Sequence, residues 1–230
     1  MLKDIKNDFN SLKNPEKAKK LAGFFKTAKG EYGYGDNFLG IIVPEQRKLA
    51  KKYPNLSLEN LQELLSSNIH EYRLTSLFIL ISKYKKADSE KEKIFKFYLK
   101  NTKNINNWDL VDLSAPNIVG HYLNDKDKNI LYKLAKSDNL WEKRIAILST
   151  YTFIRNNQFE HTLNISEILL KNKHDLIHKA VGWMLREVGK RNLGTEENFL
   201  KKYYKEMPRT MLRYAIEKFP ENKRQFYLKK

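Results

Sequence analysis

Apolar residues recur along this chain at intervals of three and four positions, the spacing that places them on one face of an α-helix. Four segments carry the same apolar stripe, namely those near 70–84, 141–155, 175–190 and 208–219. Only Gly40-Ile41-Ile42-Val43-Pro44 has the composition of a strand, and it is too short to found a sheet. The pattern therefore predicts an all-α protein.

Local signals mark where several helices begin. Asn14 followed by Pro15 predicts an N-cap with proline at the first helical position, and Ser57 precedes a further apolar stripe. Ser89 and Glu92 have the spacing of a capping box. Another helix is expected to open at Thr195, before two acids, and a late helix is expected between two prolines, Pro208 and Pro220.

The four striped segments each begin with basic residues, at Arg73, at Arg144, at Lys179 and in the region Arg209–Arg213. The interval from 144 to 179 is 35 positions, and the interval from 73 to 144 is about two such steps. A period of about 35–40 residues with two helices per unit is typical of HEAT-like repeats. We therefore expect one domain over residues 1–230, an α-α superhelix with a basic concave groove.

Composition adds a polyanion partner to this picture. Lys and Arg total 44 against 27 Asp and Glu, a formal net charge of +17, and each phosphate that a protein neutralises releases condensed counterions. The alternative explanation is a lysine-rich composition inherited from an AT-rich genome. The sequence has no apolar run long enough to span a membrane and no signal peptide, so a cytoplasmic protein is expected, associated with the nucleoid when bound to DNA.

Several kinds of chemistry are excluded or disfavoured. With no cysteine, the chain has no disulfide, thiol nucleophile or Cys-ligated zinc. His174 and His178 are four apart but lack the glutamate of a zinc-binding H-E-x-x-H helix, so neither a metal nor a cofactor is expected. The glycine-rich segment 29–36 is neither a P-loop nor a Rossmann turn. Its tyrosines, Tyr32 and Tyr34, either contact nucleic acid or belong to a plain connector.

One repeat step of about 35 residues after Arg73 falls near position 108, in an acidic segment. There Trp108 and Asp112 are four apart and so share a helix face. An acid on a basic wall opposes DNA binding and needs another reason to be there. The structural alternative is that Asp112 pairs with a neighbouring arginine while Trp108 fills a gap between helices. Spacing alone does not decide whether Asp109 or Asp112 points into the groove.

A second segment, two repeats later, pairs Trp183 with Arg186 on one helix face. Gly182 beside them costs a helix about 1 kcal/mol relative to alanine, which indicates close approach of a backbone or a ligand. We expect Trp108 and Trp183 to flank one groove with Arg144 between them. Taken alone, Trp183 is better explained as a core tryptophan.

These motifs resemble those of the DNA alkylation repair enzymes of AlkD type, which are HEAT-like-repeat DNA glycosylases. The resemblance lies in Asn107-Trp108-Asp109-Leu110-Val111-Asp112, in Trp141-Glu142-Lys143-Arg144 and in the run from Lys179 to Arg186, and it extends from about Phe24 to Arg209. It implies a hydrolase of base excision repair that removes N3- or N7-alkylated purines from double-stranded DNA. Such an open solenoid needs no partner subunit, so a monomer is expected.

The resemblance also implies residue roles. Asp112 is the catalytic carboxylate, and Trp108 and Trp183 pack against the deoxyribose at the lesion. DNA contacts are expected from five basic residues: Arg144, Arg186, Lys179, Arg73 and Arg213. Two alternatives stay open, a non-catalytic paralogue that binds damaged or branched DNA and a helical scaffold for an acidic protein partner.

Overall fold

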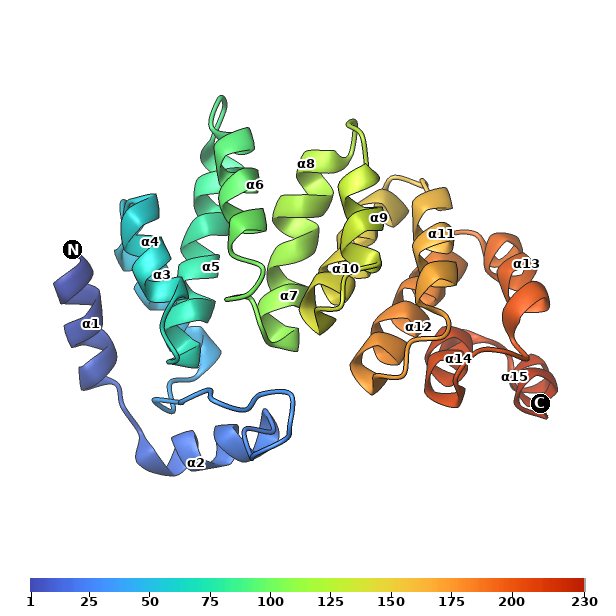
Figure 1. The fold of residues 1–230 in the computed structure, drawn as a ribbon, viewed down its shortest axis with the longest axis horizontal. Helices are drawn as coiled ribbons and strands as arrows, with labels where there is room; N and C mark the ends of the chain where they lie inside the picture. Colours follow the sequence, from blue (N-terminus) through green and yellow to red (C-terminus); the bar gives the residue numbers. More distant parts are fainter. Residues whose placement is uncertain (230) are drawn as a thin grey trace. The chain divides into compact units, whose positions relative to one another are not determined.

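The computed structural model describes residues 1–229, and its regular structure is helical throughout (Figure 1). The chain divides into two compact units, Met1–Ser114 (unit 1) and Ala115–Lys230 (unit 2). Within residues 1–229 the strand-type pairing is limited to an isolated parallel bridge between Asn37 and Ile69. The all-α prediction is confirmed, whereas the basic groove and a single functional domain over residues 1–230 stay predictions.

Unit 1 is built from helices of 8 to 17 residues. In chain order they are α1 (Leu2–Ser11), α2 (Pro15–Phe24), α3 (Val43–Lys52), α4 (Leu58–Leu65), α5 (His70–Lys86), α6 (Lys91–Lys100) and α7 (Trp108–Ala115). Helix α5 packs against α3, α4 and α6 and is buried along most of its length. A helix buried on several sides needs apolar residues all round, which is why α5 carries more than a single stripe.

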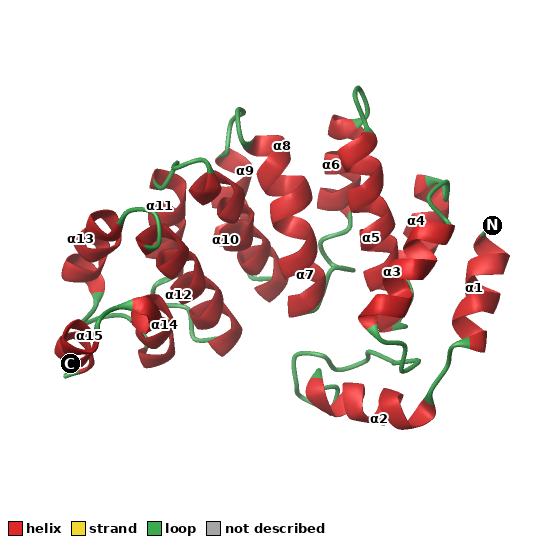
Figure 2. Cartoon of the chain, turned by 180° about the vertical axis from the view of Figure 1, so that it is seen from behind, coloured by secondary structure: helices red, strands yellow, loops and turns green. Residues whose placement is uncertain are grey.

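Helix α2 differs from the others because none of its residues is buried. It lies crosswise near the ends of its neighbours in unit 1 in both views of the chain (Figures 1 and 2). The backbone N–H of Asn14 donates to the carbonyl of Leu39 at 2.8 Å, which ties together the two ends of the segment 14–39. Gly40, with φ +84°, packs against the backbone of Asn14 and Ala18, where a Cβ would collide.

Unit 2 continues the helical pattern. It contains the π-turn η1 (Pro116–Gly120), α8 (His121–Leu123), α9 (Asn129–Ala135), α10 (Leu140–Arg155), α11 (Glu160–Leu169), α12 (Asp175–Gly189), α13 (Leu193–Tyr203), α14 (Arg209–Ala215), the 3-10 turn η2 (Ile216–Lys218) and α15 (Glu221–Leu228). Helix α10 packs on η1, α9, α11 and α12, and α12 packs on α11, α13 and α14. Each long helix is thus covered by shorter neighbours, as in helical repeats.

Two special backbone features shape unit 2. Pro116 interrupts a helix and lies in the π-turn, as expected for a residue without an N–H, and its carbonyl accepts a hydrogen bond from the Thr152 hydroxyl at 2.7 Å. Gly182 faces α14, where a Cβ would meet the Met211 carbonyl and lie 2.5 Å from the Cβ of Tyr214. The close approach expected at Gly182 is therefore that of a neighbouring helix.

The predicted helix starts are partly confirmed. The side chains of Asn14 and Ser57 cap α2 and α4 as expected. The capping box at Ser89 is wrong, because α6 begins one position later, after Glu90, and has no side-chain cap. Helix α13 begins before Thr195 rather than at it, since the Asn192 side chain accepts the Thr195 N–H and supplies the cap.

Two further segments differ from expectation. The strand-like segment 40–44 forms no strand, because it leads into α3 at Val43. The late helix is divided into α14 and η2, and Pro220 caps α15 rather than only ending the preceding helix. Pro44 is the second residue of α3 and Pro220 is the N-cap of α15, and both are positions where the missing N–H of proline is tolerated.

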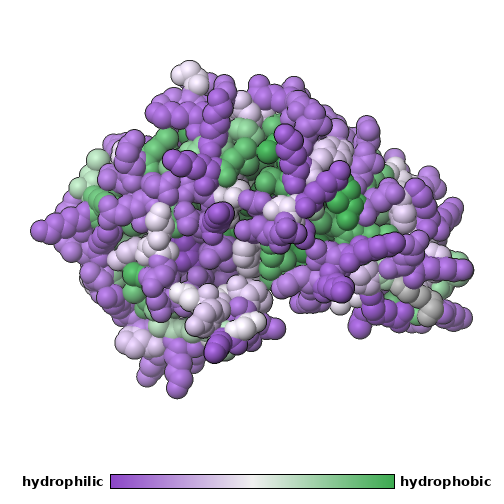
Figure 3. All heavy atoms as spheres, viewed as in Figure 1, coloured by the Kyte–Doolittle hydropathy of each residue, from purple (hydrophilic) through white to green (hydrophobic). Residues whose placement is uncertain are grey.

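The face drawn in Figure 3 is mostly hydrophilic, with hydrophobic residues visible between the hydrophilic ones. Phe24, at the end of α2, is an exception with 63% of its surface exposed. Within residues 1–229 no helix is long and apolar enough to cross a membrane.

Candidate active site

Helix α7 carries the acidic motif. Trp108 is its first residue and Asp112 lies one turn later, and both side chains are half-buried. Asn107 precedes the helix, and its side-chain oxygen accepts the Trp108 backbone N–H at 2.8 Å while its carbonyl accepts the N–H of Val111. The helix start is thereby fixed at the tryptophan, and the shared face predicted for Trp108 and Asp112 follows from the helical geometry.

Asp109 is held by a histidine of the neighbouring helix α5. Its Oδ2 lies 2.8 Å from Nε2 of His70, and its Oδ1 accepts the Leu110 N–H at 2.9 Å. The carboxylate of Asp109 therefore has a structural use. Asp112 as the catalytic carboxylate stays a prediction.

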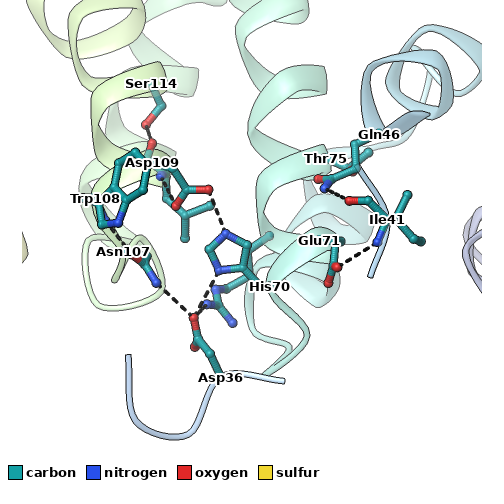
Figure 4. A network of polar contacts seen from close by, with 12 residues as sticks. Asp36, Ile41, Gln46, His70, Glu71, Thr75, Asn107, Trp108, Asp109 and Ser114 are labelled. Carbon is teal, nitrogen blue, oxygen red and sulfur yellow. Dashed lines mark hydrogen bonds and ion pairs between the residues drawn. The ribbon is translucent and has the colours of Figure 1, made fainter. Parts of the chain in front are cut away.

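The other ring nitrogen of His70 faces a second carboxylate, that of Asp36 at the end of the glycine-rich loop (Figure 4). Oδ2 of Asp36 lies 3.1 Å from Nδ1 of His70, and it accepts from Arg73 at 2.6 Å and from Asn107 at 3.5 Å. Burial opposes ionisation, but the hydrogen bond from His70 and the charges of Arg73 and His70 lower the pKa of Asp36. Asp36 is therefore an ionised carboxylate inside unit 1.

His70 is almost fully buried between these two acids, with 2% of its surface exposed. Burial alone would lower its pKa, but the charge of Asp109 and the hydrogen bonds to Asp109 and Asp36 raise the pKa of His70 above its usual value. A carboxylate can only accept hydrogen bonds, so both ring nitrogens must donate, which occurs only in the protonated ring. Geometry and charge thus agree on an imidazolium.

Aromatic rings connect this polar cluster to the tryptophan. The ring of Phe25 lies 4.8 Å from His70, 5.2 Å from Phe38 and 5.3 Å from Trp108, measured between centroids. Exposed Phe24 meets Trp108 edge-on at 5.9 Å. Aromatic pairs at such distances contribute about 0.5–1.5 kcal/mol beyond area burial, so Trp108 is held by the end of α2.

In unit 2, Trp183 and Arg186 share a cluster with two acids. Nε1 of Trp183 donates to Oε1 of Glu187 at 3.3 Å, and the guanidinium of Arg186 pairs with Glu217. The same Glu187 also pairs with Lys190 at 2.6 Å. Arg186 keeps 16% of its side chain exposed. Carboxylates of Glu187 and Glu217 therefore hold both Trp183 and Arg186 on the face predicted for them.

The remaining basic candidates differ in accessibility. Arg73 and Arg144 are buried, with 2% and 5% exposed, and they donate to the carbonyls of Ser67 and Leu176 respectively. Lys179 is partly exposed and pairs with Asp175 at 2.7 Å, whereas Arg213 is exposed. The expectation that each helix start presents an open positive charge is not met by Arg73 and Arg144, because both lie on helix faces that pack inward.

The residues considered for metal binding have backbone partners. His174 caps α12 by accepting the Leu176 N–H, and Nε2 of His178 lies 2.5 Å from the carbonyl of Asn172. Residues 1–229 contain no group of three or more His, Asp or Glu side chains placed to hold a metal ion. A surface hollow of about 410 Å³ between Pro54 and Ile94 includes none of the predicted site residues.

Asp36, His70 and Phe25 are the residues of this site that sequence reasoning missed. His70 lies 34 positions from Asp36 and 39 positions from Asp109, so no spacing within one helix connects them. The glycine-rich loop was singled out for its tyrosines, yet its contact with the site is made by Asp36. His70 meets Asp36 and Asp109 only once α5, α7 and the loop are packed together.

Comparison with known proteins identifies a family for nearly the whole chain. The sequence profile described as "DNA alkylation repair enzyme" matches residues 5–219. No curated protein sequence matches the chain significantly.

Three solved structures share its fold. A predicted DNA alkylation repair enzyme from Enterococcus faecalis is 19% identical with a TM-score of 0.70, covering 91% of this chain and 97% of its own. AlkD2 from Streptococcus mutans is 16% identical with a TM-score of 0.56, covering 89% and 98%. The smu.31 protein from Streptococcus mutans is 18% identical with a TM-score of 0.54, covering 77% and 92%.

Proposed function

The chain belongs to the DNA alkylation repair enzyme family, and from this premise we propose that it is a DNA glycosylase that excises N3- and N7-alkylated purines from duplex DNA. The observation that carries the proposal is the arrangement on α7, where Trp108 and Asp112 lie one turn apart while Asp109 is taken up by His70. A carboxylate beside an aromatic side chain suits a reaction that develops positive charge on a sugar.

Alkylation at N3 or N7 makes the purine cationic, so the base leaves as a neutral molecule and needs no general acid. The electron pair of the glycosidic bond departs with the base, and positive charge develops on the deoxyribose. The carboxylate of Asp112 stabilises that charge and orients the water that attacks C1′. Trp108 and Trp183 are proposed to pack against the deoxyribose and to limit the access of other water.

The size of this effect follows from Coulomb's law. A unit charge pair about 4 Å apart at an effective dielectric of about 20 interacts by about 4 kcal/mol, which corresponds to about a thousandfold in rate. Such assistance is sufficient for the weakened bond of a cationic base and insufficient for an intact purine. The mechanism therefore restricts the enzyme to lesions that carry their own positive charge.

Binding is proposed to rest on phosphate contacts from Arg213, Lys179, Arg186, Arg73 and Arg144. The first is exposed and the next two pair with partly exposed acids, so a phosphate has access to them. For Arg73 and Arg144 a phosphate would have to replace internal acceptors. The proposed DNA-bound protein is a monomer without a cofactor.

The proposal is tested by measuring purines released from duplex DNA methylated at N3 and N7. Asp112→Asn is expected to keep its affinity for duplex DNA and to lose most of its excision rate, by about a thousandfold. Asp138→Asn, at a loop position before α10, is the matched control and should excise as the parent does. Wild-type protein that releases no methylated purine would refute the glycosylase proposal and leave a non-catalytic DNA binder.

The phosphate contacts have a separate test. Arg213→Ala should weaken binding to every duplex sequence alike, because phosphates carry no base identity, and it should reduce the salt dependence of binding. Arg144→Ala should weaken binding in the same sequence-independent way, with a loss of folding stability because Arg144 is buried. Binding that does not respond to salt would favour the scaffold for an acidic protein instead.

A further inference from the structure

The ion cluster around His70 has a composition that packing alone does not require. Two acids, Asp36 and Asp109, face one protonated ring, and Arg73 supplies a second positive charge within 2.6 Å of Asp36. With the ring protonated, the four side chains sum to zero charge. Loss of the His70 proton leaves one ring N–H for two carboxylates, so one of the acids would lose its hydrogen bond from His70 and the cluster would carry a net negative charge.

We propose that His70 is a positioning residue of the excision site, which holds Asp109 so that Trp108 and Asp112, the neighbouring residues of α7, stay in place. This inference rests on the proposed function, since it assigns His70 a role in the same reaction. His70 acts through its neighbours and touches no reacting atom.

Helix α7 carries two carboxylates close together, those of Asp109 and Asp112. Asp109 and Asp112 are three residues apart on α7, so their Cβ atoms lie about 5–6 Å from each other. Two uncompensated negative charges at this separation repel each other. Because His70 compensates the charge of Asp109, Asp112 is spared that repulsion.

His70 also helps to hold Trp108 in position. His70 is connected to Trp108 indirectly in two ways. It contacts Asp109, the residue after Trp108 on α7, and it contacts the ring of Phe25, which in turn packs against Trp108. On the other side it fixes Asp36, the last residue of the glycine-rich loop, while neighbouring Glu71 accepts the backbone N–H groups of residues 39–41. The first turn of α5 therefore ties the loop and the end of α2 to α7.

This arrangement implies a pH dependence. The charged groups that face His70 are Asp36 from the loop, Asp109 from α7 and Arg73 from α5 itself, while Glu71 is turned toward residues 39–41. Carboxylates at both ring nitrogens favour the protonated ring, and because the pKa of His70 is raised in the folded protein, the ring loses its proton at a higher pH than an ordinary histidine. Excision should then fall on the alkaline side.

The test compares single-turnover release of 7-methylguanine from methylated duplex DNA between about pH 6 and pH 10. The parent rate should fall at alkaline pH with the loss of one proton. His70→Gln, which has no imidazolium to lose, should be at least about tenfold slower at neutral pH and should lack this alkaline fall, with DNA affinity nearly unchanged. His161→Gln in unit 2 is the matched control and should follow the parent profile.

A second variant keeps the histidine. Asp36→Asn removes one of the two anionic partners, so the alkaline fall should move to lower pH while the hydrogen-bonding shape is retained. Parent-like rates and pH profiles in both His70→Gln and Asp36→Asn would overturn the positioning role. Thermal unfolding of each variant shows whether a slow variant is folded.

A measurement without substrate separates this inference from the proposed function. Imidazole nitrogen NMR should show protons on both Nδ1 and Nε2 of His70 at neutral pH, and the indole N–H resonance of Trp108 should shift as the ring titrates. A neutral ring at pH 7, or a Trp108 resonance that ignores the titration, would overturn the inference. If the parent released no base, the glycosylase proposal would fail and these spectra would still decide whether His70 positions Trp108.

Discussion

Glu196 on α13 offers a prediction whose size can be worked out from the structure. Its carboxyl group is 1% exposed, its Oε1 has no hydrogen-bond partner within residues 1–229, and its other oxygen fills the space left by the missing side chain of Gly189. Burial, helped by the charge of Glu197 and opposed by that of Arg186, raises the pKa of Glu196 to about 9. The group is therefore neutral in the folded protein at pH 7.

The sign of the effect on stability follows from the protons bound. In the unfolded chain Glu196 ionises near its ordinary pKa of 4.5, and in the folded protein it ionises near 9. Between these values the folded protein holds one proton more, so the free energy of unfolding falls by about 1.4 kcal/mol per pH unit. From pH 5 to pH 8 this amounts to about 4 kcal/mol, and the contribution is fully present only below the unfolded pKa.

Glu196→Gln keeps the shape and removes the ionisation. We expect the variant to match the parent near pH 5 and to become the more stable protein as the pH rises, by up to about 4 kcal/mol near pH 8. Urea unfolding at several pH values measures the difference, in which other titrating groups cancel. Glu197→Gln, next along α13 and paired with Lys223, is the control and should show no such growing advantage. Parallel stability curves for Glu196→Gln and the parent would refute the reasoning.

Three further changes have expected outcomes. Gly182→Ala should destabilise the protein by about 1–3 kcal/mol in urea unfolding, because the new methyl meets the backbone of α14. Gly23→Ala in α2, where nothing lies within 4 Å, should instead stabilise the protein by up to about 1 kcal/mol. A gain in stability from both variants would contradict the packing of Gly182 against α14. Glu217→Gln frees Arg186 and should tighten duplex binding and steepen its salt dependence by about one charge; unchanged binding in a filter or anisotropy assay would exclude Arg186 as a phosphate contact. Thr152→Val removes the hydrogen bond to the Pro116 carbonyl and should lower the unfolding free energy by about 1 kcal/mol, whereas no change in thermal unfolding would show that the π-turn does not depend on it.

The apolar periodicity was sufficient to predict the helices, because each long helix buries a face against neighbours within its own unit. The segments around 145 and 181 are examples, and both lie at the centre of unit 2 as α10 and α12. Helix ends were less predictable. Helix α6 begins after Ser89 without a side-chain cap, and α13 is capped by Asn192 ahead of Thr195, so these starts depend on local backbone geometry that propensity alone does not determine.

Counting charges along the sequence does not tell which basic side chains are exposed, for a physical reason. A basic residue at the start of a helix can point outward, as Arg213 does, or into the packing between helices, as Arg73 and Arg144 do, and sequence spacing is the same in both cases. The partner of Asp109 was likewise beyond the sequence, because it is His70, a residue of a different helix. Partners that meet only through tertiary packing leave no periodic signal.

The tied ends of the segment 14–39 have a consequence for how this protein can vary. Because Asn14 and Leu39 are joined at its base and α2 buries no residue, the intervening chain can be lengthened, shortened or recoded without repacking α3 to α7. Its fixed points are Phe25 and Asp36, which contact Trp108 and His70. Helix α2, which buries no residue, thus borders the residue proposed to meet the damaged nucleotide, so we expect lineages to diverge in lesion preference through this insert while the helices beneath it stay constant.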